Sequence, residues 1–230
     1  MSMPFYVSPE QMTADKAEFA RKRIARGKDL VTLEFEGGIL QVAENPFDLT
    51  KIGEIYDRVS FAGVGKYSEF DRLRKIGVQW ADVEGFRFSR EDVRGKALAN
   101  LYSQLIGDEF IRSLKPLEVE IVVAEVGDDA LVGNEKNNIY KVQFDGSIND
   151  LSRFCVIGGS AEVITRHLDS AFRPDLSLSD ALRLGRDALQ HSENTALDIP
   201  AENLEVCWLD RRRAGRKFRR LDTDEIRALL

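Results

Sequence analysis

The chain has 230 residues, of which 31% are charged, and a formal net charge of -6. This length suits one large domain or two small ones and can bury a sizeable core without covalent cross-links. Two cysteines and two histidines exclude a disulfide scaffold and argue against a histidine-rich metal site. No apolar run approaches the roughly 18–20 residues of a membrane span, and the first residues do not form a secretory signal. We therefore expect a cytoplasmic globular protein with no membrane partner and, given its acidic balance, no nucleic-acid partner.

A helix is predicted close to the start of the chain. Ser8, Pro9 and Gln11 follow the capping-box pattern, in which Ser8 caps the helix and the Gln11 side chain returns to the cap. Basic residues crowd the last turns, where they suit the negative end of the helix dipole. Gly27 follows as the expected terminator.

Hairpins and paired helices are predicted over the rest of the chain. Apolar patterning and turn residues indicate strands at residues 30–35, 39–43, 51–57, 59–64, 117–126, 138–145, 153–157, 204–210 and 217–221. Apolar spacings of three and four indicate helices at residues 66–83, 90–112 (capped by Ser89), 161–171, 178–190 and 223–230. This order does not alternate as in a doubly wound parallel sheet. It predicts an α+β fold of stacked antiparallel sheets with helix pairs on the outer faces.

The glycine-rich segment at residues 63–68 does not fulfil the phosphate-loop pattern. The position five before Gly65 is Ser60, and Lys66 is followed by Tyr67 rather than by serine or threonine. We interpret the segment as a junction between a strand and a helix.

The cysteines and histidines show no catalytic or metal-binding spacing. Cys155 and Cys207 lie in apolar strands, as buried thiols do. His167 and His191 have no recognisable ligand pattern around them and are expected at a surface or interface. No nucleophile elbow is present. Residue spacing thus predicts no catalytic residue, no metal site and no cofactor.

A basic run at residues 211–220 contains seven arginines and lysines. It permits a contact patch for RNA or DNA, or a basic surface for an acidic partner subunit. The acidity of the rest of the chain favours a solvated hairpin around Ala214 and Gly215.

Several segments together resemble the α-type subunit of bacterial, actinobacterial-type proteasome core particles. They are residues 42–46, 51–59, 61–67, 69–70, 116–120, 123–126, 145–148 and 158–159, and the resemblance extends over residues 1–230. The resemblance implies the N-terminal nucleophile hydrolase fold, a four-layer αββα sandwich of two five-stranded sheets. It divides a single α-type domain, residues 1–230, into a gating segment (1–8), an N-terminal helix (9–27) and the sandwich (28–230).

The resemblance also implies an assembly in which this chain is not the peptidase. Seven copies would form a closed head-to-tail ring on a ring of β-type subunits. In the β type, a threonine freed at the N-terminus supplies both the nucleophile and the base. Here the nucleophile position falls near Lys28, while Glu44 and Lys51 take the carboxylate and lysine positions. Because 27 residues precede Lys28 and no threonine stands there, we expect no peptidase activity.

Lys51 and Gly65 are the expected docking residues for an activator. In the family, the equivalent lysine lies in a pocket between neighbouring α subunits and pairs with the C-terminal carboxylate of an ATPase or other ring activator. Gly65 corresponds to a glycine that lines this pocket, where a side chain would block the incoming tail.

The first eight residues are the expected gate. Seven such apolar segments would crowd the ring axis and close the entry pore. The gate residues are Met1, Ser2, Met3, Pro4, Phe5, Tyr6, Val7 and Ser8. The Tyr-Asp-Arg run of archaeal and eukaryotic α subunits is missing, so their gate-switching contacts are not carried over.

The predicted function is a non-catalytic α-ring subunit that scaffolds assembly, gates entry and docks activator tails. Two alternatives remain at this point. The first is an active threonine peptidase of the same fold, and the second is a nucleic-acid-binding protein that uses the 211–220 hairpin.

Overall fold

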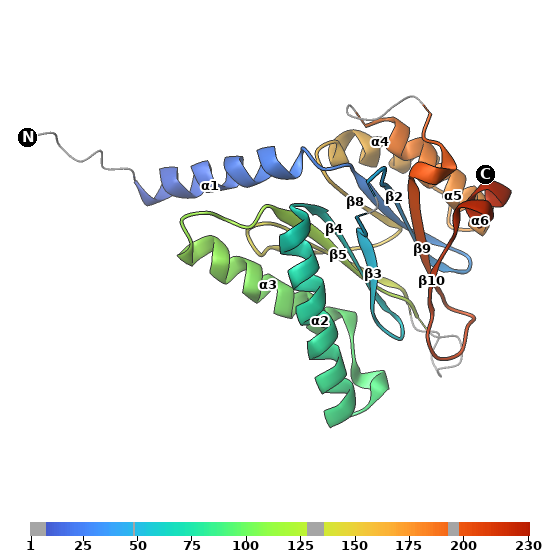
Figure 1. Cartoon of the computed structure of the whole chain (residues 1–230), viewed down its shortest axis with the longest axis horizontal. Helices are drawn as coiled ribbons and strands as arrows, with labels where there is room; N and C mark the ends of the chain where they lie inside the picture. Colours follow the sequence, from blue (N-terminus) through green and yellow to red (C-terminus); the bar gives the residue numbers. More distant parts are fainter. Residues whose placement is uncertain (1–7, 48, 128–135, 193–197) are drawn as a thin grey trace, which may run out of the picture.

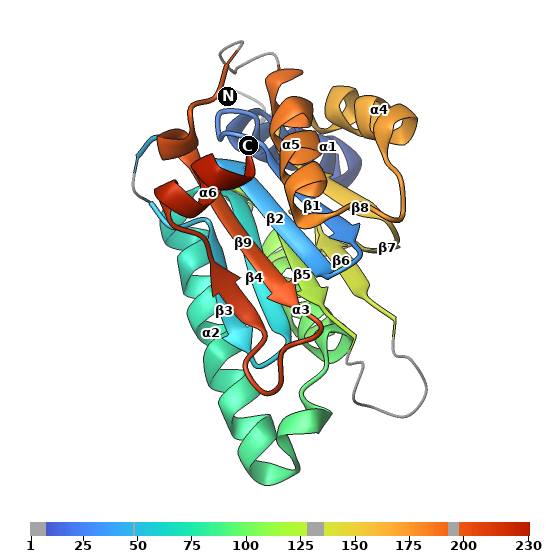
Figure 2. The ribbon, with the colours of Figure 1, turned by 90° about the vertical axis from the view of Figure 1, so that its right-hand side faces the viewer.

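The computed structural model describes residues 8–47, 49–127, 136–192 and 198–230. These residues form two antiparallel sheets of five strands each, stacked face to face, with helices on both outer faces (Figures 1 and 2). The predicted four-layer sandwich is therefore confirmed.

The first sheet has the strand order β10-β9-β2-β1-β8. Its strands are β1 (Leu30–Phe35), β2 (Gly38–Glu44), β8 (Phe154–Ile157), β9 (Leu204–Asp210) and β10 (Phe218–Arg220). A tight turn joins β1 to β2, with Phe35 opposite Gly38. Gly38 has a φ of +140°, and a Cβ there would lie 2.0 Å from the Leu209 carbonyl oxygen, so only glycine fits this turn.

The second sheet has the order β3-β4-β5-β6-β7. Its strands are β3 (Ile52–Tyr56), β4 (Val59–Gly65), β5 (Val119–Glu125), β6 (Asn138–Val142) and β7 (Ile148–Leu151). The sequence did not predict β7. This edge strand has only four residues, all at least partly exposed, so it lacks the alternating apolar pattern that reveals a strand.

The helices are α1 (Pro9–Ile24), α2 (Tyr67–Arg87), α3 (Gly95–Arg112), α4 (Ala161–Ala171), α5 (Leu178–Gln190) and α6 (Thr223–Leu229). The pair α2 and α3 covers the second sheet, and the pair α4 and α5 covers the first (Figure 2). Helix α6 packs beside α5. Helix α1 projects from one end of the sandwich, with its N-terminal end far from the sheets (Figure 1). None of the helices in the described ranges combines the length and apolar character needed to cross a lipid bilayer.

Three apolar clusters hold these layers together. One lies between the two sheets and includes Ala20 and Ile24 of α1, so the base of α1 is part of the main core. The second joins the first sheet to α4, α5 and α6, and the third joins the second sheet to α2 and α3. Cys155 and Cys207 are buried in the cluster between the sheets, as predicted.

The predicted helix over residues 90–112 is wrong at its start. A 3-10 helix spans Arg90–Asp92, and α3 begins only at Gly95. Between them Val93 is extended and almost fully buried, and the backbone N–H of Gly95 donates to the Glu125 carboxylate at 2.9 Å. These tertiary contacts interrupt the helix. Ser89 caps the 3-10 helix instead.

The capping of α1 also differs in part from the prediction. The Ser8 hydroxyl accepts from the Gln11 N–H at 3.2 Å, as expected. The Gln11 side chain does not return to the cap, because its amide donates to Asp15 one turn further on. The α2 helix extends to Arg87, four residues beyond its predicted end. Its last buried residue is Ala81, so no core-facing residue marks the final turn.

Candidate functional site

Lys51 lies where α1 enters the sandwich and the two sheets meet. It is half-buried, and its Nζ donates to the carbonyl oxygens of Lys28 and Glu44, both at 2.9 Å. Across the β3–β4 pair, its own carbonyl accepts from the Gly63 N–H at 3.0 Å. Among the described residues, no carboxylate forms an ion pair with this ammonium. Two of its three N–H donors are occupied, so one remains for a ligand.

The ionisation of Lys51 reflects this setting. Burial lowers the pKa of Lys51 to about 8, although the surrounding carboxylates of Glu205, Glu44 and Asp29 oppose the shift. A buried ammonium held by neutral carbonyls is incompletely compensated. An incoming carboxylate would supply the missing charge.

Glu205 fixes the backbone at Lys51. From β9, its carboxylate accepts from the N–H groups of Lys51 at 2.9 Å and Ile52 at 3.0 Å. It also accepts from the Asn45 side chain at 2.8 Å and pairs with Arg220 at 2.5 Å. Glu205 therefore ties the first sheet to the start of the second. Sequence reasoning missed this residue because the backbone groups that it holds, at Lys51 and Ile52, are 154 and 153 positions away in the chain.

The three predicted remnants of a peptidase site do come together. The Lys28 amine pairs with the buried Glu44 carboxylate at 3.1 Å, and Lys51 holds the Lys28 carbonyl. Lys28, at the position that the resemblance assigns to the nucleophile, thus neutralises the Glu44 carboxylate. Lys28 also follows α1 along the same chain, so its backbone nitrogen is part of a peptide bond and is not a free amine.

Asp29 forms a second buried polar group beside this site. Its carboxylate accepts from the Ser160 N–H at 2.9 Å and from the Ser192 hydroxyl at 2.6 Å, and the two serine oxygens are 3.1 Å apart. These contacts connect the start of β1 to the segments before α4 and after α5. Sequence reasoning missed them because none of the three residues belongs to a local motif.

Gly65 lies at the end of β4, two residues beyond the partner of Lys51. Its φ is +114°, and a Cβ would come within 1.9 Å of the Glu118 carbonyl oxygen. The backbone therefore requires glycine here whether or not a ligand binds. The base of α1 is close, since a Cβ on Gly27 would lie 3.3 Å from the Gly65 nitrogen.

Ser8, the last of the predicted gate residues, caps α1. Residues 1–7 of that prediction lie outside the described residues. The structure therefore describes only the last residue of the predicted gate.

The basic run at residues 211–220 is largely paired with acidic side chains. Arg212 pairs with Glu36, Arg216 with Glu54, Arg219 with Glu225 and Arg220 with Glu205. Lys217 is buried, and its amine donates to the Arg211 and Arg213 carbonyls. This pairing leaves little free positive charge for a phosphate backbone.

The sandwich, the altered nucleophile position and the helix before it define a class: a non-catalytic chain with the N-terminal nucleophile hydrolase fold. Comparison with known proteins makes this class more specific. The family model described as "Proteasome subunit" matches residues 26–209. The "Proteasome subunit alpha" of Thermobifida fusca (strain YX) is 49% identical over 231 residues, which cover 100% of this chain and 91% of that protein.

Other relatives give the same result. The "Proteasome subunit alpha" of Pseudarthrobacter chlorophenolicus is 47% identical, with 100% of both chains covered. That of Acidimicrobium ferrooxidans is 46% identical over 100% of this chain and 97% of the other. The chain belongs to the proteasome subunit family and is of the α type. It is therefore a non-catalytic subunit of a larger assembly, which contradicts the alternative of an active peptidase.

Proposed function

We propose that seven copies of the chain form the α ring of a cytoplasmic proteasome core and dock β-type subunits. In this proposal, residues 1–8 gate substrate entry, and Lys51 binds the C-terminal carboxylate of an ATPase or other ring activator. Residues 1–230 act as one α-type domain. The observation that carries the docking proposal is the Lys51 ammonium, which is held by two carbonyls and has no carboxylate partner among the described residues.

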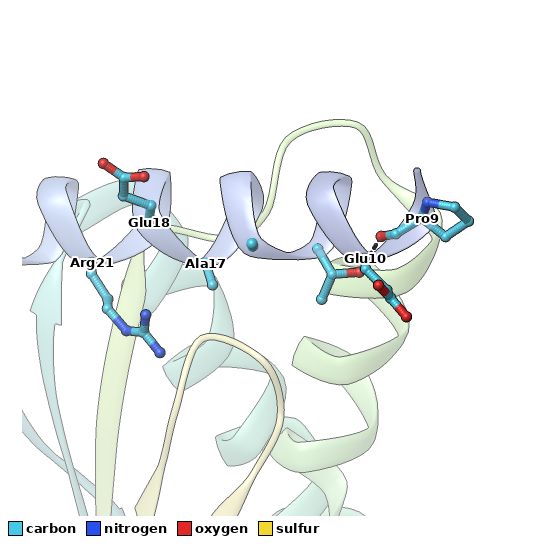
Figure 3. A pocket seen from close by; sticks show the side chains of 7 residues that line it. Pro9, Glu10, Ala17, Glu18 and Arg21 are labelled. Carbon is cyan, nitrogen blue, oxygen red and sulfur yellow. Dashed lines mark hydrogen bonds between the residues drawn. The ribbon is translucent and has the colours of Figure 1, made fainter. Parts of the chain in front are cut away.

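Surface pockets beside α1 support a ring. On one side of α1, a pocket is lined by that helix alone, from Pro9 to Arg21 (Figure 3). On the other side, an apolar pocket lies between α1 and the segment after α3, with Met12, Phe19 and Leu114 exposed. A helix flanked by open pockets on both sides suits a neighbouring copy that packs against it.

Replacement of Lys51 tests the docking proposal. In a reconstituted core, Lys51→Ala should abolish activator-stimulated protein degradation, because the tail carboxylate loses the ammonium that would pair with it. Basal peptide hydrolysis and ring assembly should remain. The matched control is Lys75→Ala, which removes an exposed amine from α2 that pairs with Asp71. If stimulation survives in Lys51→Ala, Lys51 is not the docking charge.

Truncation tests the gating proposal. Because Ser8 caps α1, the informative variant lacks residues 1–7 and keeps Ser8 as the cap. It should raise the basal rate of peptide hydrolysis severalfold, since the pore is no longer occluded. A Ser8→Ala variant of the full chain is the control for lost capping. Equal rates for the truncated and full-length cores would contradict the gate.

A further inference from the structure

The two histidines of the chain meet one aspartate between α4 and α5. His167 lies on α4, Asp187 lies on α5, and His191 is the C-cap of α5. The imidazole rings stack with centroids 3.8 Å apart, and the His167 Nε2 lies 2.9 Å from an Asp187 carboxylate oxygen. One ligand atom from each residue can be chosen so that all three lie within 4.8 Å of one another.

The His191 ring contacts a backbone carbonyl through one of its two nitrogens. Its Nδ1 lies 2.9 Å from the Asp187 backbone carbonyl. A carbonyl only accepts, so Nδ1 carries the proton and the Nε2 of the neutral ring keeps its lone pair. Metal-binding histidines are commonly held by this contact from the other ring nitrogen to a backbone carbonyl.

The His167 Nε2 is buried and has no hydrogen-bond partner among the described residues. The Asp187 oxygen is close, but it lies outside the direction in which a ring N–H donates. Buried polar atoms are normally satisfied, so this nitrogen lacks a partner that a ligand would provide. Asp187 and His191 are exposed, which leaves the site open to solvent.

A bound cation would suit this position in charge and in ligand type. Tetrahedral zinc bound by nitrogen and oxygen needs ligand atoms about 3.4 Å apart and lies in the plane of each imidazole, so the two stacked rings would turn apart when the ion binds. The site also lies at the C-terminal end of α5, where the helix dipole favours positive charge.

We propose that His167, Asp187 and His191 bind a divalent transition-metal ion, with Zn²⁺ as the probe, which ties α4 to α5. Two imidazoles and one carboxylate suit zinc, and water would complete the coordination. Magnesium and calcium prefer oxygen ligands alone. Cys155 and Cys207 do not compete, because they are buried and burial raises the pKa of each thiol to about 12. The ligands come from two helices, which explains why spacing along the sequence predicts no metal site.

Titration of the untagged full chain, first stripped with a chelator, tests the proposal. Calorimetry with Zn²⁺ should show one equivalent per chain. His191→Ala and Asp187→Asn should each weaken binding at least tenfold. Asp169→Asn, the same change at an exposed position on α4, should leave binding unchanged. Co²⁺ should give the visible spectrum of a tetrahedral site in the wild type and lose it in the two ligand variants.

Equal Zn²⁺ affinity of the wild type and His191→Ala would overturn the proposal, as would the absence of stoichiometric binding. A Co²⁺ spectrum that is unaffected by Asp187→Asn would do the same. Because Asp187 and His191 are exposed, their variants should keep the fold, and circular dichroism and ring assembly check this.

Discussion

At the scale of single residues, Lys51 combines burial with an unused donor. Its backbone is fixed by Glu205, and its ammonium is fixed by two carbonyls. A ligand therefore meets a charge that is already in position, and little side-chain entropy is lost on binding. The lowered pKa makes this charge sensitive to pH.

Tail binding should weaken as the pH rises above about 8, where free Lys51 loses its proton. Well below that pH the ammonium is fully present and affinity should be constant. Above it, docking must also take up a proton, so affinity should fall roughly fivefold between pH 8 and pH 9. Fluorescence anisotropy with a peptide of the activator's C-terminal residues measures this.

The control is Lys51→Arg, whose guanidinium keeps its charge throughout this pH range. Any binding that remains in this variant should not change between pH 7 and pH 9. If the affinity of the wild type is also constant between pH 7 and pH 9, docking does not depend on the titration of Lys51.

At the scale of elements, the sequence predicts those helices and strands whose bounds are set by local patterns. It does not predict those whose bounds are set by tertiary contacts. The β1 strand and the α4 and α5 helices match their predicted bounds, because apolar spacing marks all three and Ser177 caps the start of α5. The short edge strand β7 and the break before Gly95 depend on partners elsewhere in the fold.

The same limit applies to the site. The resemblance identified Lys51, Glu44 and Lys28, and the structure brings all three together. Glu205 and Asp29 could not be predicted, because carboxylates that accept from distant backbone groups leave no local signal.

Helix α6 provides a test of one such local pattern. Asp222 and Glu225 form a complete capping box, with reciprocal contacts of 2.8 and 3.0 Å. Asp222→Ala should lower the free energy of unfolding of the isolated chain by about 1 kcal/mol. Asp224→Ala, which loses only an exposed pair with Arg227, should cost clearly less. Denaturant titration compares the two, and equal losses would argue against the cap.

At the scale of the whole molecule, the surface around α1 is unusually apolar for a free chain. Ile111 at the end of α3 is 77% exposed, Leu114 just after α3 is 89% exposed, and Phe19 of α1 is also exposed. Single exposed apolar residues are common, but a group beside an open pocket indicates an interface.

Charge placed in this group should prevent ring formation. Phe19→Asp combined with Leu114→Asp should shift native mass spectra from heptamers toward single chains, since buried unpaired carboxylates oppose association. Both residues are exposed, so the isolated chain should keep its stability. Ser170→Asp adds charge at the far end of α4 and should leave the ring intact. Heptamers from the double variant would place the interface elsewhere.

The burial of the base of α1 makes this helix part of the folded core. Ala20 and Ile24 are buried in the core between the two sheets, so the base of α1 is packed into the sandwich four residues before Lys28. A threonine placed at position 28 would therefore still have no free amine, because α1 precedes it in the chain. Removing α1 to free that amine would expose the main core to water. The helix that keeps the subunit inactive is therefore also needed for its stability.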